Sequence, residues 1–220
     1  MIAKELISTS IQPVRTSDTG EEVLQKMQIY HVSHLPIVNK SRILGIISEE
    51  DILINDPKEP VGLYRLTHHQ AFCKERDHIF DLMTKLGTLQ LSVIPIVDEV
   101  KEIYLGVVTL EDLLKYFAVH FSFTDPGSII VLECSNHNYL LSEIIRLAEA
   151  DDISVLSSFI TSIPGSNKIY ITLKTNAQDL NAYKASLERF GYIIHASFSD
   201  TEYSDSLLDR FDSLMTYLNI

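Results

Sequence analysis

The sequence predicts an α/β (α+β) protein in which two β-α-β-β-α units precede a β-α-β-β-α-β unit. Three observations predict this order. The phrase GIISEED at residues 45–51 returns as GVVTLED at residues 106–112. Apolar strand patterns alternate with helical apolar stripes around both copies of the phrase. Beyond residue 125 the pattern changes, which indicates a separate C-terminal unit.

The composition is that of a folded protein with an excess of acidic residues. Of the 220 residues, 45% are hydrophobic, and the formal net charge is −12. A phosphate backbone is therefore a poor partner, since nucleic-acid-binding proteins concentrate Lys and Arg. No apolar run is long enough to span a bilayer, and the N-terminus lacks the apolar region of a signal peptide. We therefore expect a cytoplasmic protein with no nucleic-acid or membrane partner.

An internal repeat relates the first two units. HLPIV at residues 34–38 aligns with VIPIV at residues 93–97, and the same offset aligns the apolar stripes of the preceding helices. A short insertion in the following turn, where extra residues are well tolerated, then brings Asp51 over Asp112. The sequence therefore predicts one fold unit present twice.

Each copy predicts the same succession of elements. A short extended piece, at residues 11–14 or 71–73, precedes an amphipathic helix. In the second copy the helical stripe comprises Ile79, Leu82, Met83 and Leu86. The next strand contains a proline, which favours an edge position or a strand start. A turn then leads to a second strand, at residues 42–47 or 103–108, and to a second helix. Since a unit of roughly 50 residues cannot bury both faces alone, we expect the copies to pack sheet to sheet.

These motifs, HLPIV with LGIISEEDIL and VIPIV with YLGVVTLEDLL, resemble tandem cystathionine-β-synthase (CBS) domains, also called a Bateman module. The resemblance covers about residues 1–120. It implies one CBS unit at residues 1–58, a second at residues 59–124, and a pseudo-twofold axis between them. It also implies two clefts that bind adenosine-type ligands.

A capping box explains the repeated phrase without any ligand. Ser48 and Thr109 each precede a predicted helix, with Asp51 and Asp112 three residues later. The hydroxyl would accept from the third backbone N–H of the helix, and the acid would favour the positive end of the helix dipole. The ligand interpretation uses the same atoms, because a hydroxyl that accepts a capping bond still has a hydrogen to donate. Both interpretations stay open from the sequence.

The CBS resemblance assigns ligand contacts to these residues. It implies that Ser48 and Thr109 contact phosphate, and that Asp51 and Asp112 contact the ribose hydroxyls. It places the base among apolar residues and backbone near Pro36, Ile37, Pro95 and Ile96. The candidate ligands are AMP, ADP, ATP and S-adenosylmethionine.

The polar residues near the two clefts differ between the copies. His34 is matched by Val93, so the clefts are not chemically equal. Arg15 and Lys74 occupy matching places and are candidates to neutralise phosphate, although they also fit exposed strand-end cations. The acids that crowd the helix starts are Glu49, Glu50 and Glu111. Because nearby negative charge opposes a polyphosphate, we expect a monophosphate or a neutral adenosine derivative rather than ATP.

The C-terminal third predicts a ferredoxin-like sheet with helices on one face. The predicted strands and helices lie at residues 128–134, 140–148, 153–163, 168–175, 177–190 and 192–198, with Gly191 ending the second helix. Behind a CBS pair, residues 125–200 resemble an ACT domain. The whole order resembles proteins of the acetoin utilisation protein B type.

The last segment, residues 201–220, predicts an amphipathic helix. Its apolar stripe comprises Leu207, Leu208, Phe211, Leu214, Met215 and Leu218. Packing within the chain or a dimer seam fits this stripe better than a membrane contact, because the segment has few cations.

No motif predicts catalysis or a metal site. The chain has no GxSxG, no P-loop and no HExxH. We expect no catalytic residue and no metal ligand. The sequence predicts a non-catalytic regulatory module, a homodimer that binds an adenosine-type ligand and transmits its state to a regulated protein or across the dimer. The alternative is a structural or oligomerisation scaffold with vestigial clefts.

Overall fold

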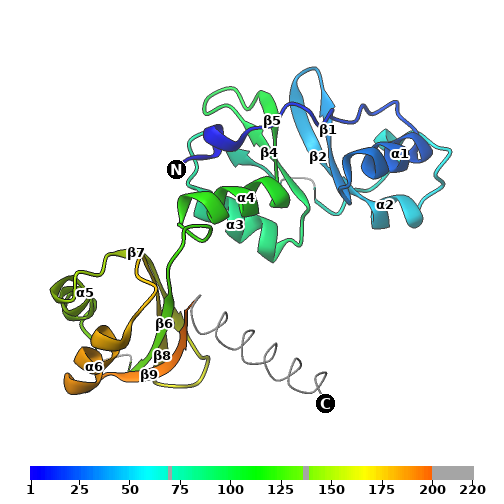
Figure 1. Ribbon diagram of the computed structural model, residues 1–220. Helices are drawn as coiled ribbons and strands as arrows, with labels where there is room; N and C mark the ends of the chain where they lie inside the picture. Colours follow the sequence, from blue (N-terminus) through cyan, green and yellow to red (C-terminus); the bar gives the residue numbers. More distant parts are fainter. Residues whose placement is uncertain (69–70, 136–138, 200–220) are drawn as a thin grey trace, which may run out of the picture. The chain divides into compact units, whose positions relative to one another are not determined.

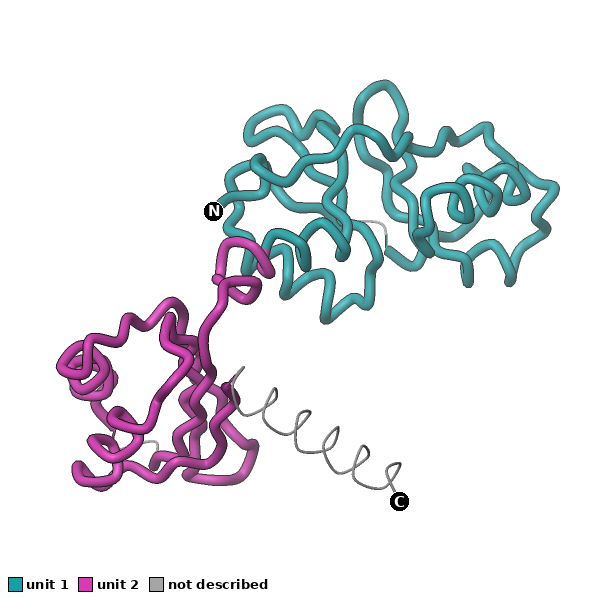
Figure 2. Tube along the Cα trace, in the orientation of Figure 1, with its two compact units in different colours: residues 1–116 teal, residues 117–220 magenta. Residues whose placement is uncertain are grey.

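Two similar sets of strands and helices make up the N-terminal half of the chain. The computed structural model describes residues 1–68, 71–135 and 139–199, which fall into two compact units, 1–116 and 117–220 (Figures 1 and 2). The first copy comprises η1 (Ala3–Leu6), α1 (Gly20–Tyr30), β1 (His34–Asn39), β2 (Arg42–Ser48), α2 (Glu49–Leu53) and η2 (Val61–Leu63). The second copy comprises β3 (Cys73–Lys74), α3 (Ile79–Thr88), β4 (Val93–Val97), β5 (Tyr104–Thr109) and α4 (Leu110–His120).

The strand pairs of the two copies share one register. In the antiparallel pair β1–β2, His34 lies opposite Ser48, and in β4–β5, Val93 lies opposite Thr109. Each pair also shows one irregularity at the same place, after Ile37 in β1 and after the equivalent Ile96 in β4. The duplication predicted from the sequence is therefore present in the strand pairing.

The prediction of an edge position for the proline strands is wrong in the second copy. The strand order is β3-β4-β5, so β4 with its Pro95 is the central strand. The sheet accommodates the missing N–H because β3 pairs with the residues that follow the proline, Cys73 with Ile96 and Lys74 with Val97. In the first copy the segment around Val14 lies beside β1. The N–H of Val14 donates to the carbonyl oxygen of Pro36 at 2.8 Å.

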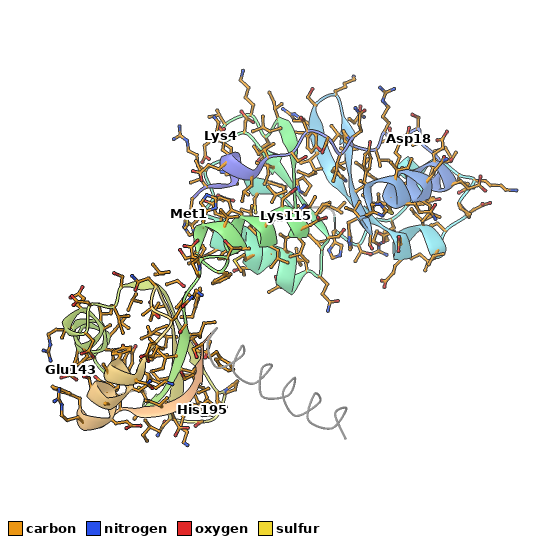
Figure 3. All side chains as sticks on the ribbon, in the orientation of Figure 1. Met1, Lys4, Asp18, Lys115, Glu143 and His195 are labelled. Carbon is orange, nitrogen blue, oxygen red and sulfur yellow. The ribbon has the colours of Figure 1, made fainter. Side chains whose placement is uncertain are left out.

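The segment that precedes each copy pairs with the other copy. Ser8 exchanges two backbone hydrogen bonds with Val107 of β5, at 2.8 and 3.0 Å. Likewise the N–H of Ile46 in β2 donates to the carbonyl of His68, at 2.9 Å. Lys4, labelled in Figure 3, adds an ion pair to Glu75 at 3.0 Å. Each copy is therefore joined to the other by backbone hydrogen bonds from the segment that precedes it, at Ser8 for the first copy and at His68 for the second.

Buried apolar residues of the second copy pack against the core of the first copy. The cluster of the first copy includes Val93 and Val107 of the second copy, as the expected sheet-to-sheet packing requires. In α3 the residues Ile79, Leu82 and Leu86 are buried. Met83 is 41% exposed, so its predicted place in the buried stripe is wrong. A helix turns about 100° per residue, which carries Met83 past the edge of the narrow face that contacts the sheet.

The second unit is a four-stranded antiparallel sheet with two helices. Its elements are β6 (Ile129–Ser135), α5 (Leu141–Ala150), β7 (Val155–Ser162), β8 (Lys168–Thr175), α6 (Asn181–Arg189) and β9 (Ile193–Phe198). The strand order is β7-β8-β6-β9, and α5 and α6 lie on one face of the sheet (Figure 1). Gly191, with φ of +83°, follows α6 as predicted.

Several predictions about the C-terminal third stay predictions. The ACT assignment of residues 125–200 and the domain boundaries are among them. The predicted helix at residues 201–220 lies outside the described residues. Among the residues that the structure does describe, no helix is long and apolar enough to cross a membrane.

Candidate functional site

The first copy of the repeated phrase forms a complete capping box at the start of α2. The backbone N–H of Asp51 donates to Oγ of Ser48 at 3.0 Å, and the backbone N–H of Ser48 donates to Oδ2 of Asp51 at 3.0 Å. Aspartate therefore fills the place that Glu or Gln usually takes in this motif. The capping prediction is confirmed for this copy.

Asp51 is also buried and bonded to a residue that lies between the two copies. Its exposed fraction is 1%, and the hydroxyl of Thr67 donates to Oδ1 at 2.7 Å. Burial alone would raise the pKa of this carboxyl, but the hydrogen bonds from Thr67 and Ser48 outweigh it and hold the pKa below its ordinary value. The group is therefore ionised at neutral pH. The hydroxyl of Ser48 and the backbone N–H of Thr67 also lower this pKa by hydrogen bonding.

A cleft of about 260 Å³ lies beside this capping box. Its lining comes from both copies and comprises Ser33, His34, Ser48, Glu49, Glu50, Thr67, His68, Leu89 and Gln90. Asp51 lies directly behind the wall, since it is hydrogen-bonded to two of the lining residues, Ser48 and Thr67. The volume is slightly below the range of about 300–1,000 Å³ that is usual for small-molecule sites.

The ring of His34 is fixed by the second copy. The backbone N–H of Ser92 donates to Nδ1 of His34 at 3.2 Å, and the hydroxyl of Ser92 lies 3.2 Å from the same atom. Because Nδ1 accepts, the hydrogen-bond pattern assigns the proton of the neutral ring to Nε2. Ser92 makes a further hydrogen bond to the first copy, because the N–H of Ser33 donates to the Ser92 hydroxyl at 3.0 Å. Ser92 therefore orients a residue of the cleft from across the repeat.

The second copy closes its capping box differently. The backbone N–H of Asp112 donates to Oγ1 of Thr109 at 2.9 Å, as in the first copy. The Thr109 hydroxyl then donates its own hydrogen to Oδ2 of Asp112 at 2.7 Å. Asp112 is half-buried, whereas Asp51 is buried. The hydroxyl of Thr109 is thus committed to its own acid.

Comparison with known proteins agrees with the repeat. The family model described as "CBS domain" matches the chain twice, over residues 3–57 and 66–119. Residues 3–119 form a tandem CBS domain pair. The matches end at residue 119, before β6, so they leave the ACT-like assignment and the resemblance to the acetoin utilisation protein B type as predictions.

Individual relatives of the CBS pair are distant. The chain is 24% identical over 156 residues to an inosine-5′-monophosphate dehydrogenase of Methanocaldococcus jannaschii, and spans only 31% of that protein. A CBS domain pair/ACT domain protein from Thermotoga maritima has a TM-score of 0.48 and 24% identity, covering 53% of this chain and 96% of that one. A CBS domain pair in complex with 5′-methylthioadenosine and S-adenosyl-L-methionine has a TM-score of 0.44 and 21% identity, covering 54% of this chain and 96% of that one.

The cleft of the CBS pair brings together only some of the residues predicted from the sequence. Ser48 and His34 line it, and Asp51 lies behind its wall. Arg15 is exposed and Lys74 lies 3.8 Å from Glu99 in an ion pair, and neither lines the cleft. The predicted base-contacting residues Pro36, Ile37, Pro95 and Ile96 are buried. Their ligand roles, like those of Thr109 and Asp112, stay predictions.

Residues at the cleft were missed from the sequence, among them Thr67 and His68 of its lining and Ser92, which orients His34. Thr67 and His68 lie between η2 and β3, in a segment that carries no strand or helix pattern of its own. Ser92 aligns with Ser33 under the same offset as the two prolines. That alignment was the available signal, because the N–H of Ser33 donates to the hydroxyl of its own equivalent, Ser92.

A reactive thiol is not favoured at Cys73. The side chain is fully buried, and burial raises the pKa of this thiol to about 11. The positive charge of Lys85 only partly opposes the shift. At neutral pH the thiol is therefore protonated and a poor nucleophile.

We expect acid to destabilise the CBS pair through His34. Burial, followed by repulsion from His68, lowers the pKa of His34 despite the opposing charges of Asp51 and Glu50. Between that lowered pKa and the ordinary value of about 6.5, the unfolded chain binds more protons, so stability falls as pH falls. Urea unfolding at pH 7 and pH 5 should show that wild type loses more stability than His34→Gln, by less than about 1 kcal/mol after solvent screening. Equal losses in both proteins would contradict this assignment.

Proposed function

We propose that this chain is a non-catalytic regulatory module whose first CBS cleft binds an adenosine-type ligand. CBS domain pairs usually bind such ligands as regulatory modules, and residues 3–119 form such a pair. The observation that carries the proposal is the ionised Asp51 behind Ser48 and Thr67. The resemblance assigns to this carboxylate the hydrogen bonds from the ribose hydroxyls.

The proposed contacts use the donors and acceptors of the capping box itself. The Ser48 hydroxyl accepts from the N–H of Asp51, and in this proposal its own hydrogen turns from the Asp51 carboxylate to the ligand. The carboxylate of Asp51 is the acceptor for the ribose hydroxyls. Ribose hydroxyls would reach it beside or in place of the Thr67 hydroxyl. Binding would then act on a regulated protein or across a homodimer by its affinity difference between two states of the chain.

The scaffold alternative is favoured by one observation. Asp51 is 1% exposed, and both of its oxygens already accept a hydrogen bond within the chain. If this arrangement never opens, the box only caps α2 and fixes Thr67. The protein would then serve assembly, with clefts that hold no ligand.

Calorimetric titration separates the two functions. We expect at least one of AMP, ADP, ATP and S-adenosylmethionine to bind the full chain, and Asp51→Asn to abolish that binding, because an amide cannot offer the anionic acceptor that two hydroxyls need. The matched control is Asp98→Asn. Asp98 accepts from the N–H groups of Lys101 and Ile103 in a turn of the same unit and does not line the cleft.

The control variant should bind as wild type does, and melting curves should show that both variants remain folded. No heat with any of the four ligands would leave the scaffold as the function. Equal loss of binding in both variants would show that the Asp51 effect is not specific.

A further inference from the structure

The first cleft has an unbalanced charge. Its described lining contains Glu49 and Glu50 but neither Lys nor Arg, and both glutamates are exposed. The ionised Asp51 lies directly behind the wall. A ligand in this cleft therefore meets up to three negative charges and no permanent positive charge.

His34 does not restore the balance at neutral pH. Its Nδ1 accepts from the backbone N–H of Ser92 at 3.2 Å. A proton on Nδ1 would point at that N–H, and the hydrogen bond would be lost. Burial and the nearby His68 lower the pKa of His34 as well. The ring therefore stays neutral and offers an Nε2–H donor.

His68 is the other imidazole of the lining. Its ring centre lies 6.2 Å from that of His34, so a charge on one ring opposes a charge on the other. The pair can donate hydrogen bonds to a ligand.

The cations predicted to neutralise phosphate lie elsewhere. Lys74 is 3.8 Å from Glu99, and Arg15 is exposed in a turn where its backbone N–H donates to Asp18. Lys115, a further cation that was not among those predictions, is labelled in Figure 3 and pairs with Glu111 at 2.6 Å on α4. None of the three lines the cleft.

We propose that the first cleft selects its ligand by charge: it binds an adenine nucleoside whose 5′ substituent is neutral or positively charged, and it disfavours one that carries a 5′ phosphate. The inference rests on the proposed function, and names the ligand class of the same site. One carboxylate at about 4 Å weakens the binding of a unit negative charge roughly 5-fold even in water. Glu49 and Glu50 together therefore weaken a 5′ phosphate by roughly 30-fold or more.

Titrations of the full chain with three probes test this selection. The probes are 5′-methylthioadenosine, which is neutral, S-adenosylmethionine, whose sulfonium is positive, and AMP. We expect the first two to bind at least roughly 30-fold more tightly than AMP. In Glu49→Gln/Glu50→Gln, AMP should gain roughly 30-fold or more, while 5′-methylthioadenosine changes by less than about 2-fold.

Two controls locate the effect. Glu21→Gln/Glu102→Gln removes the same charge from exposed positions of the same unit outside the cleft lining, and should leave all three affinities unchanged within about 2-fold. Ring signals of ¹³C-labelled histidine should shift for His34 and His68 on binding, because both rings line the first cleft and position 93 of the second copy is valine.

The outcomes are distinct. AMP that binds as tightly as 5′-methylthioadenosine, with shifted His34 signals, overturns the charge selection and leaves the proposed function standing. Probes that bind without shifting these signals place the ligand elsewhere and overturn the assignment to this cleft. Failure of all three probes, together with ADP and ATP, overturns the proposed function and the selection with it.

Discussion

Gly106→Ala is expected to lower the free energy of unfolding of residues 1–116 by about 3 kcal/mol. A Cβ at this position would lie 2.6 Å from Cγ2 of Ile7 and 2.6 Å from the carbonyl oxygen of Ser8. The φ of +154° is also one that L side chains rarely adopt. Ser8 cannot retreat without losing its two backbone hydrogen bonds to Val107. The substitution therefore separates the N-terminal segment from β5.

Urea unfolding measures this loss, and hydrogen exchange locates it. The amides of Ser8 and Val107 should lose protection before those of β1 and β2. Gly87→Ala is the matched control, because Gly87 lies in α3 with nothing within 4 Å of an added Cβ. Alanine there should stabilise the unit by about 0.5–1 kcal/mol. A change in Gly106→Ala smaller than about 0.5 kcal/mol would show that the extension is not held as described.

The same glycine shows which parts of the fold the sequence could predict. Its place in the phrase GVVTLED was visible from the repeat, as were the strand and helix that flank it. The neighbour that requires a glycine was not visible. Ser8 lies far away in the sequence and reaches β5 by an isolated backbone pairing, without an alternating strand pattern. Local patterns predict elements, whereas such long-range pairings depend on how the two copies fold together.

The candidate site divides in a similar way. The box of Ser48 and Asp51 follows from residue types at a fixed spacing, because a helix start must satisfy its free N–H groups. Two other features depend on contacts made when the chain folds. The hydroxyl of Thr67 donates to the buried Asp51, and the N–H of Ser92 donates to His34. The sequence predicted which groups could bind a ligand. It did not predict that the acid of the first box is buried while that of the second is half-buried.

Tyr183→Ala is expected to cost the second unit about 4 kcal/mol, the largest single-residue effect proposed for this chain. Tyr183 lies on α6 and is fully buried in the core between the helices and the sheet. Its hydroxyl donates to the carbonyl of Ile144 on α5 at 3.0 Å, so one side chain both fills the core and joins the two helices. Truncation removes the ring and leaves a cavity that α5 and α6 can close only by moving. Hydrogen exchange should show the loss of protection in residues 129–198.

Tyr183→Phe separates packing from hydrogen bonding. The ring stays in place and only the donor to Ile144 is lost, so we expect a decrease of about 1 kcal/mol. A decrease close to that of Tyr183→Ala would instead make the hydroxyl the principal tie between α5 and α6. Because residues 117–220 are a separate compact unit with their own core, exchange in β1 and β2 should stay unchanged in both variants. Loss of protection there as well would show that the two units unfold together.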